Sequence, residues 1–210
     1  MRDAFVSAIR SNRASFEIDL ADDVIERLAD YYDLVQMHNP ILHLVGPCSP
    51  EEFATRHILE CLTMLRFLPQ GARFADVGAG AGLPSIPCLI ARSDLHGHLI
   101  ESKEKKTKFL TTAIDALKLS ERAAVSNRQF AEVDLTNIDH VCSRALDRFE
   151  ETLPRLLKWT GKRTLMLFAG NKLRLALEKH RVVFTSVLMP LSEQRYLFVV
   201  DADNRNRKYS

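Results

Sequence analysis

The spacing of apolar residues in the first third of the chain predicts two helices. In the first, apolar side chains recur at steps of three and four residues, at Leu20, Val24, Leu28, Tyr31 and Val35. This spacing is typical of one buried face of an α-helix. The second helix is predicted to begin after Ser49, because the stretch "SPEE" supplies an N-cap hydroxyl, a proline at the first helical position and a glutamate three residues after the cap.

The pattern changes after residue 71 to short β-type runs that alternate with helical stretches. The runs cover residues 73–77, 98–101, 123–126, 141–142, 164–168, 182–188 and 196–200. This alternation predicts an α/β fold with a doubly wound, mainly parallel sheet of seven strands. Residues 189–195 are too few for a helical crossover, so the last strand is predicted to be antiparallel. We therefore expect an N-terminal helical extension over residues 1–68 and a ligand-binding domain over residues 69–210.

Composition narrows the class of protein only slightly. Of the 210 residues 46% are hydrophobic and 27% are charged, and the net charge is +2, which neither predicts nor excludes a nucleic-acid partner. The chain has no apolar run near the ~18 residues of a membrane span and no signal-peptide pattern at its start, so we expect a cytoplasmic protein without a membrane partner. Four scattered cysteines predict reduced thiols and no metal site.

The main candidate for ligand binding is the loop after the first predicted strand, where residues 74–87 read "FADVGAGAGLPSIP". Ligands of open α/β sheets bind at the carboxyl ends of the strands, and alternate glycines at Gly78, Gly80 and Gly82 allow close approach to the backbone. The dinucleotide motif G-x-G-x-x-G would need a third glycine at position 83, which is Leu83. The loop therefore favours a nucleoside ligand other than NAD, with a tight turn that binds nothing as the alternative.

Two carboxylates indicate which nucleoside the loop binds. Asp76 lies two residues before the first glycine, where a carboxylate repels a pyrophosphate and attracts an ammonium group. Glu101 ends the second predicted strand, where a carboxylate accepts hydrogen bonds from both ribose hydroxyls; a solvated strand end is its alternative. S-adenosylmethionine carries an α-ammonium group, a sulfonium and a ribose, and is the predicted cofactor.

Four segments together resemble the RsmG, or GidB, family of bacterial 16S ribosomal RNA guanine-N7 methyltransferases. They are the glycine loop, "RHILE" at residues 56–60, "LIESKEKKTKFL" at residues 99–110 and "SRAL" at residues 143–146. The resemblance extends over residues 20–200 and implies a class I, Rossmann-like methyltransferase. Carried over by position, it implies cofactor contacts at Gly78, Leu83, Gln129, Phe130 and Arg144. The segment "NRQFAEVD" also fits a shift of the third-strand pair by one residue, toward Ala131 and Glu132.

The substrate side departs from the family pattern at two places. His43-Leu44-Val45 stands where the family shows Asn-Leu-Thr, and Phe168-Ala169-Gly170 stands where it shows Leu-Lys-Gly. The candidates for substrate binding are three arginines, Arg56, Arg144 and Arg195, of which the resemblance most favours Arg144. The cofactor half of the family pattern is therefore kept, while the substrate half is altered.

The resemblance implies a monomer that methylates N7 of a guanine in 16S ribosomal RNA or in the small ribosomal subunit. Guanine N7 has a lone pair and no proton, so the reaction needs orientation rather than a general base. The lysines at positions 103, 105, 106 and 108 are candidates for phosphate contacts, with a solvated helix face as the alternative. Two other functions stay open: a methyltransferase of the same fold with another substrate, such as a small molecule, and a ribosome-associated binding protein without turnover.

Overall fold

The computed structural model describes residues 1–144 and 149–201, so Ala145 and Leu146 of the "SRAL" segment lie outside the described residues. The helices are α1 (Arg2–Asn12), α2 (Asp22–Leu42), α3 (Pro50–Glu52), α4 (Glu60–Leu62), α5 (Ser85–Ala91), α6 (Glu104–Ala116), α7 (Phe149–Thr160) and α8 (Asn171–Lys179). The strands are β1 (Arg73–Val77), β2 (His96–Ile100), β3 (Ala123–Ser126), β4 (His140–Ser143), β5 (Thr164–Ala169), β6 (Thr185–Leu188) and β7 (Tyr196–Val200). A π-helical segment, Phe53–Leu59, joins α3 to α4.

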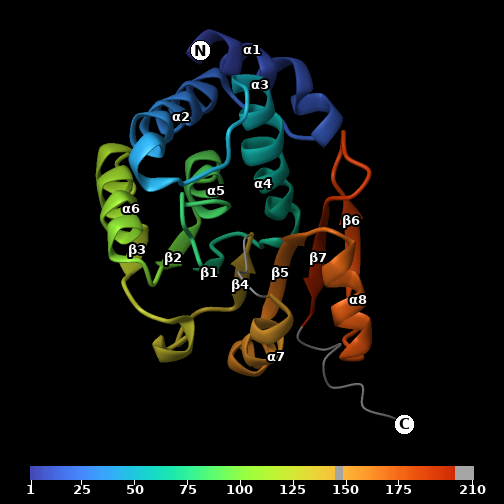
Figure 1. Cartoon of the computed structure of the whole chain (residues 1–210). Helices are drawn as coiled ribbons and strands as arrows, with labels where there is room; N and C mark the ends of the chain where they lie inside the picture. The colour runs from blue at the N-terminus through green and yellow to red at the C-terminus, as the bar shows by residue number, and fades with distance from the viewer. Residues whose placement is uncertain (145–148, 202–210) are drawn as a thin grey trace.

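The strands form one seven-stranded sheet in the order β3-β2-β1-β4-β5-β7-β6 (Figure 1). Strands β1 to β5 are parallel to one another, whereas β7 is antiparallel to both β5 and β6. The predicted doubly wound sheet with an antiparallel last strand is therefore confirmed. Strand β6 begins at Thr185 rather than at residue 182, because the backbone N–H of Val182 donates to the Leu177 carbonyl and completes the end of α8.

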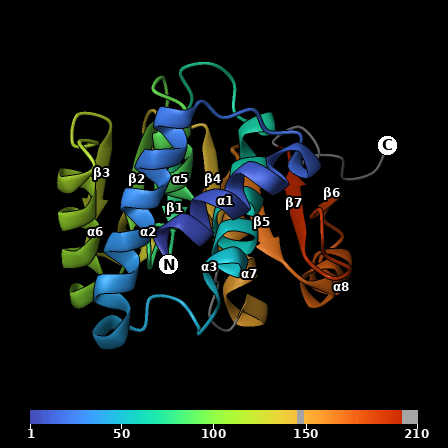
Figure 2. The ribbon, with the colours of Figure 1, turned by 90° about the horizontal axis from the view of Figure 1, so that it is seen from above.

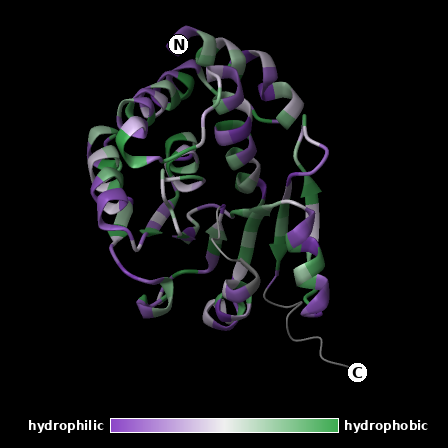
Figure 3. Ribbon diagram, viewed as in Figure 1, coloured by the Kyte–Doolittle hydropathy of each residue, from purple (hydrophilic) through white to green (hydrophobic). Residues whose placement is uncertain are grey.

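Helices cover both faces of the sheet, and on each face the helices and the sheet share a separate apolar core. The first core joins α1, α2 and the α3–α4 region to α5, α6 and one face of the sheet, and the second joins α7 and α8 to the other face. Figure 2 shows α1 and α2 lying over the sheet, and Figure 3 shows apolar residues along the strands and on the inner sides of the helices. In the first core the Phe5 ring stacks on Tyr32 with centroids 4.7 Å apart. The division of the chain at residue 68 stays a prediction, and the helices before it share a core with the sheet.

The helix predicted after Ser49 begins as expected. The Ser49 hydroxyl accepts a hydrogen bond from the Glu52 N–H, and the Glu52 carboxylate accepts one from the Ser49 N–H, which forms a capping box. The π-helical segment that follows was not predicted: the N–H of Glu60 donates to the carbonyl of Thr55, five residues earlier. Within the described residues, no helix is both long enough and apolar enough to cross a membrane.

Candidate active site

The glycine loop between β1 and α5 is held in place from two sides. The backbone N–H groups of Gly78 and Ala79 donate to the Ile100 carbonyl at 2.9 and 3.2 Å, which ties the loop to the end of β2. The Tyr31 hydroxyl, which is buried, donates to the Ala81 carbonyl at 2.8 Å from helix α2. The loop is therefore fixed by both the sheet and the N-terminal helices, and the bond from Tyr31 was not predicted from the sequence.

A cleft of about 310 Å³ opens where β1, β2, β3 and β4 end. Seven of the nine predicted cofactor-binding residues line it: Gly78, Gly80, Leu83, Glu101, Gln129, Phe130 and Arg144. Other lining residues were not assigned to the cofactor from the sequence: Leu44, Lys103, Lys106, Arg128, Thr152 and Arg155. A Cβ added to Gly80, whose φ is +55°, would meet only the Gly78 carbonyl oxygen, at 3.6 Å, so this part of the loop leaves open space beside the backbone.

Asp76, by contrast, does not line the cleft. Its side chain is fully buried behind the loop, where the Ser85 hydroxyl donates to the carboxylate and the thiol of Cys142 lies beside it. Burial raises the pKa of Asp76 to about 7, even though the hydrogen bonds from Ser85 act to lower it. Asp76 is therefore not a lining residue of the cleft, and a contact between its carboxylate and a ligand ammonium group stays a prediction.

Gly82 also lies outside the lining of the cleft. Its φ is +89°, and an added Cβ would lie 2.4 Å from Cδ1 of Ile86. The third glycine is therefore required by the turn and by the packing of the loop onto α5, rather than by the approach of a ligand. Sequence spacing alone did not separate this role from that of Gly80.

Glu101 is 6% exposed and is already oriented by two backbone donors. One carboxylate oxygen accepts from the Gly80 N–H at 3.0 Å, and the other accepts from the Lys103 N–H at 2.8 Å. A carboxylate offers about four lone-pair positions, so each oxygen keeps one for a further donor. The group is thus suited to accept the two hydroxyls of a ribose.

Another part of the cleft wall is formed by the segment after β3. Phe130 packs edge-on against Trp159 with ring centroids 5.2 Å apart, and the Trp159 indole N–H donates to the Val133 carbonyl at 3.0 Å. The Arg155 guanidinium lies 5.7 Å from the centroid of the Phe130 ring. These contacts hold an aromatic ring at the side of the cleft, where it offers an apolar surface to a nucleobase.

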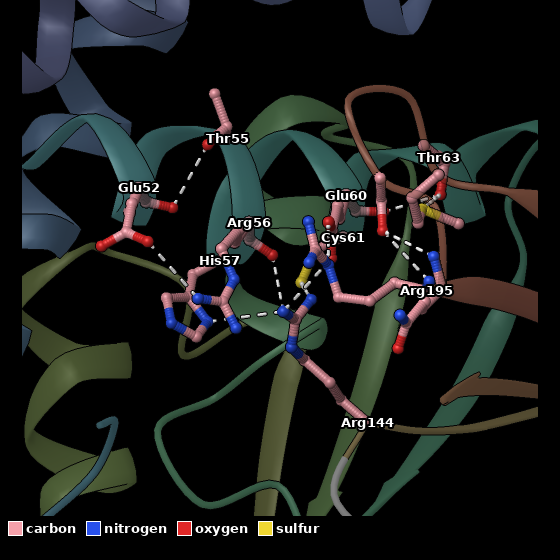
Figure 4. Close-up of polar contacts among 12 residues, drawn as sticks. Glu52, Thr55, Arg56, His57, Glu60, Cys61, Thr63, Arg144 and Arg195 are labelled. Atoms are coloured by element: carbon pink, nitrogen blue, oxygen red, sulfur yellow. Dashed lines mark hydrogen bonds and ion pairs between the residues drawn. The ribbon is translucent and has the colours of Figure 1, made fainter. Parts of the chain in front are cut away.

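Arg144, directly after β4, reaches from the cleft to the π-helical segment (Figure 4). Its Nη2 donates to the Arg56 carbonyl at 2.5 Å, and it lies 3.4 Å from His57 Nδ1 and 3.5 Å from Glu60 Oε2. Arg195 Nε donates to the other oxygen of Glu60 at 2.7 Å. The carboxylate of Glu60, which is 2% exposed, therefore lies between two arginines, an arrangement that the sequence did not predict.

The other two substrate candidates do not line the cleft. The Arg56 side chain pairs with Glu52 at 3.5 Å on the exposed side of the helix, and only its carbonyl meets Arg144. Arg195 is joined to the cleft indirectly, through Glu60 and Arg144. Burial, followed by the charges of Arg144, Arg56 and Arg195, lowers the pKa of His57 to about 3, so its imidazole is neutral and accepts at Nδ1.

The sheet order and the cleft at the carboxyl ends of the parallel strands define the class of protein by its fold, which is Rossmann-like. Solved structures with this fold include the Bacillus subtilis M1A22 tRNA methyltransferase TrmK, with a TM-score of 0.52, 20% identity and coverage of 71% of this chain and 69% of that one. Another is the pyocyanin biosynthetic protein PhzM, with a TM-score of 0.57, 15% identity and coverage of 72% and 56%. The chain belongs to the rRNA small subunit methyltransferase G family, whose model matches residues 24–195.

Curated relatives agree with this membership. Ribosomal RNA small subunit methyltransferase G of Sorangium cellulosum is 33% identical over 165 residues, which cover 76% of this chain and 69% of the relative. The protein of the same name from Neisseria meningitidis is 33% identical over 153 residues, with 73% and 72% covered. These findings confirm the predicted family and the predicted class of enzyme, a methyltransferase that uses S-adenosylmethionine.

Proposed function

We propose that this protein transfers a methyl group from S-adenosylmethionine to N7 of a guanine in the RNA of the small ribosomal subunit. The observation that carries the proposal is the cleft at the carboxyl ends of the parallel strands, in a chain of the rRNA small subunit methyltransferase G family. The residues present suit the cofactor: open backbone at Gly80, a pre-oriented carboxylate at Glu101 and an aromatic wall at Phe130. S-adenosylmethionine supplies a methyl group bound to a positively charged sulfur.

The residues around the cleft suit a reaction that depends on orientation. Guanine N7 has no proton to lose, so the protein has to align the base rather than deprotonate it. Arg144 is fixed at the edge of the cleft by four polar contacts, and its planar guanidinium offers donors to oxygen and nitrogen acceptors of a base. His57, whose pKa is about 3, takes no part as an acid at neutral pH.

The test is methyl transfer from labelled S-adenosylmethionine to undermethylated small ribosomal subunits and to their naked RNA. We expect label in the RNA, recovered as N7-methylguanosine after digestion. Binding of S-adenosylhomocysteine is measured in parallel. Normal cofactor binding without label in the RNA would contradict the proposal and favour another substrate or a binding protein without turnover.

The four lysines of the predicted cluster lie in two different surroundings in the structure. Lys103 and Lys106 line the cleft, and together with Lys105 and Glu104 they border an adjoining groove of about 380 Å³ at the end of α2, next to Ile41, Leu42 and His43. We call this the basic groove. Lys108, on the same helix, does not line the groove and pairs with Glu104 at 2.7 Å. We infer that the basic groove holds RNA phosphates next to the target base, because it shares Lys103 and Lys106 with the cleft.

Replacing Lys103 or Lys106 with glutamine is expected to weaken RNA binding modestly. Each loss of a phosphate contact should reduce the slope of log K against log salt concentration by about one at most. Lys108→Gln is the matched control on α6 and should leave the slope nearly unchanged. Binding isotherms at four or more salt concentrations measure the effect, and equal slopes for all three variants would argue against the basic groove.

A further inference from the structure

Glu60 is a buried charged residue for which the proposed reaction has no direct use. Its carboxylate is 2% exposed at the start of α4, and it does not line the cleft. It accepts from Arg195 Nε at 2.7 Å and lies 3.5 Å from Arg144 Nη2. These partners come from the segment before β7 and from the end of β4, so one carboxylate joins three parts of the fold.

The negative charge of the Glu60 carboxylate favours the close approach of the two arginine side chains. Without it, the guanidinium of Arg144, whose side chain is 16% exposed, would be repelled by that of Arg195, whose side chain is 37% exposed. The other groups around Arg144 are uncharged: the Arg56 carbonyl, the neutral imidazole of His57 and the thiol of Cys61, whose sulfur lies 3.2 Å from Arg144 Nη1. Among these contacts, Glu60 therefore supplies the negative charge that fixes Arg144.

Of the two arginines only Arg144 lines the cleft, and its guanidinium also lies 5.8 Å from the centroid of the Phe168 ring. The π-helical segment turns the Arg56 carbonyl and the Glu60 side chain toward the same guanidinium (Figure 4). Segments of π-helix inside α-helices often occur at functional sites. The orientation of the Arg144 side chain at the cleft is thus set by contacts with residues that do not themselves line the cleft.

We propose that Glu60 is a positioning residue for methyl transfer: it holds Arg144, with Arg195 as the second partner, in the orientation that aligns the target guanine. This inference rests on the proposed function. Glu60 itself contacts neither the base nor the methyl donor. Its effect on the reaction is transmitted through Arg144.

Glu60→Gln keeps the shape of the side chain and removes its charge. We expect turnover on small-subunit RNA to fall roughly tenfold to a hundredfold, because misplacement of an orienting group by about 1 Å has effects of this size. KM for RNA and the affinity for S-adenosylhomocysteine should stay within about twofold. Glu52→Gln is the matched control, since Glu52 pairs with Arg56 on the exposed side of the same helix, and it should leave turnover unchanged. Glu60→Asp keeps the charge and should restore part of the loss.

A double variant separates positioning from a purely structural role. If Glu60 acts through Arg144, then Glu60→Gln combined with Arg144→Ala should lose no more turnover than Arg144→Ala alone. Losses that multiply, or an unchanged turnover in Glu60→Gln, would overturn the proposal.

The guanidinium signal of Arg144 in nitrogen-detected NMR gives a readout that does not depend on activity. It should show restricted rotation in the wild type and in Glu52→Gln, and faster rotation in Glu60→Gln. Equal rotation in all three proteins would overturn the proposal even if no RNA were methylated. An inactive wild type with the expected NMR change would instead place the failure in the proposed function.

Discussion

Replacing Arg144 with alanine is expected to lower turnover on small-subunit RNA by roughly a hundredfold or more, with RNA affinity changed only a few-fold. The side chain lies at the edge of the cleft and is held by Arg56, His57, Glu60 and the Cys61 thiol, so its loss removes an oriented group at the reacting centre. Single-turnover methylation separates this step from product release. RNA binding is measured on the same preparation.

The control for this prediction is Arg195→Ala. This substitution removes the other arginine partner of Glu60 but changes no residue that lines the cleft. We expect a smaller loss of turnover in this variant than in Arg144→Ala. Arg144→Lys keeps the charge without the planar fork of donors, so it should restore little activity. A turnover in Arg144→Ala within a few-fold of the wild type would exclude Arg144 from the reacting centre.

The second large effect concerns Asp76 and the dependence of stability on pH. Its pKa is raised by burial from 3.8 to about 7, so between these values the folded state holds a proton that the unfolded state has released. Below pH 3.8 the raised pKa of Asp76 therefore adds its full contribution to the free energy of unfolding. That contribution is lost as the pH rises through about 7. At ~1.4 kcal/mol per pKa unit, the loss is on the order of 4 kcal/mol at most.

Asp76→Asn replaces the carboxyl with a group that does not titrate, so its free energy of unfolding should vary less between pH 4 and pH 8 than that of the wild type. Urea unfolding at several pH values measures this difference. Glu104→Gln, at an exposed site on α6, controls for the loss of one carboxylate. The same pH dependence in the wild type and in Asp76→Asn would show that Asp76 is ionised in the folded protein throughout this range.

The sequence predicted the sheet because its signal is local. The alternation of apolar runs and helical stretches predicts a doubly wound, mainly parallel sheet. The short gap before residue 196 predicts that β7 is antiparallel. The glycine loop was likewise recognisable, since alternate glycines directly after a strand have few other uses. Both features depend on residues that are neighbours along the chain.

The contacts that were not predicted depend on residues far apart in the sequence. Glu60 meets Arg144 across 84 positions and Arg195 across 135, and a glutamate in a helix gives no local sign that it will be buried between them. Asp76 and Gly82 were placed beside the ligand because they flank the loop. Proximity in sequence does not tell whether a residue lines a cleft, and neither Asp76 nor Gly82 lines this one.

The bond from Tyr31 to the Ala81 carbonyl joins helix α2 to the glycine loop, and the same helix continues to Ile41 at the basic groove. Ten residues of α-helix span about 15 Å, so one helix, with Pro40 directly before Ile41, connects the two places. Any tilt of α2 that accompanies RNA docking also displaces the backbone beside the methyl donor. If RNA docking tilts α2 in this way, the affinities for the two substrates are linked through one helix, and thermodynamic reciprocity requires that each alters the other by the same factor.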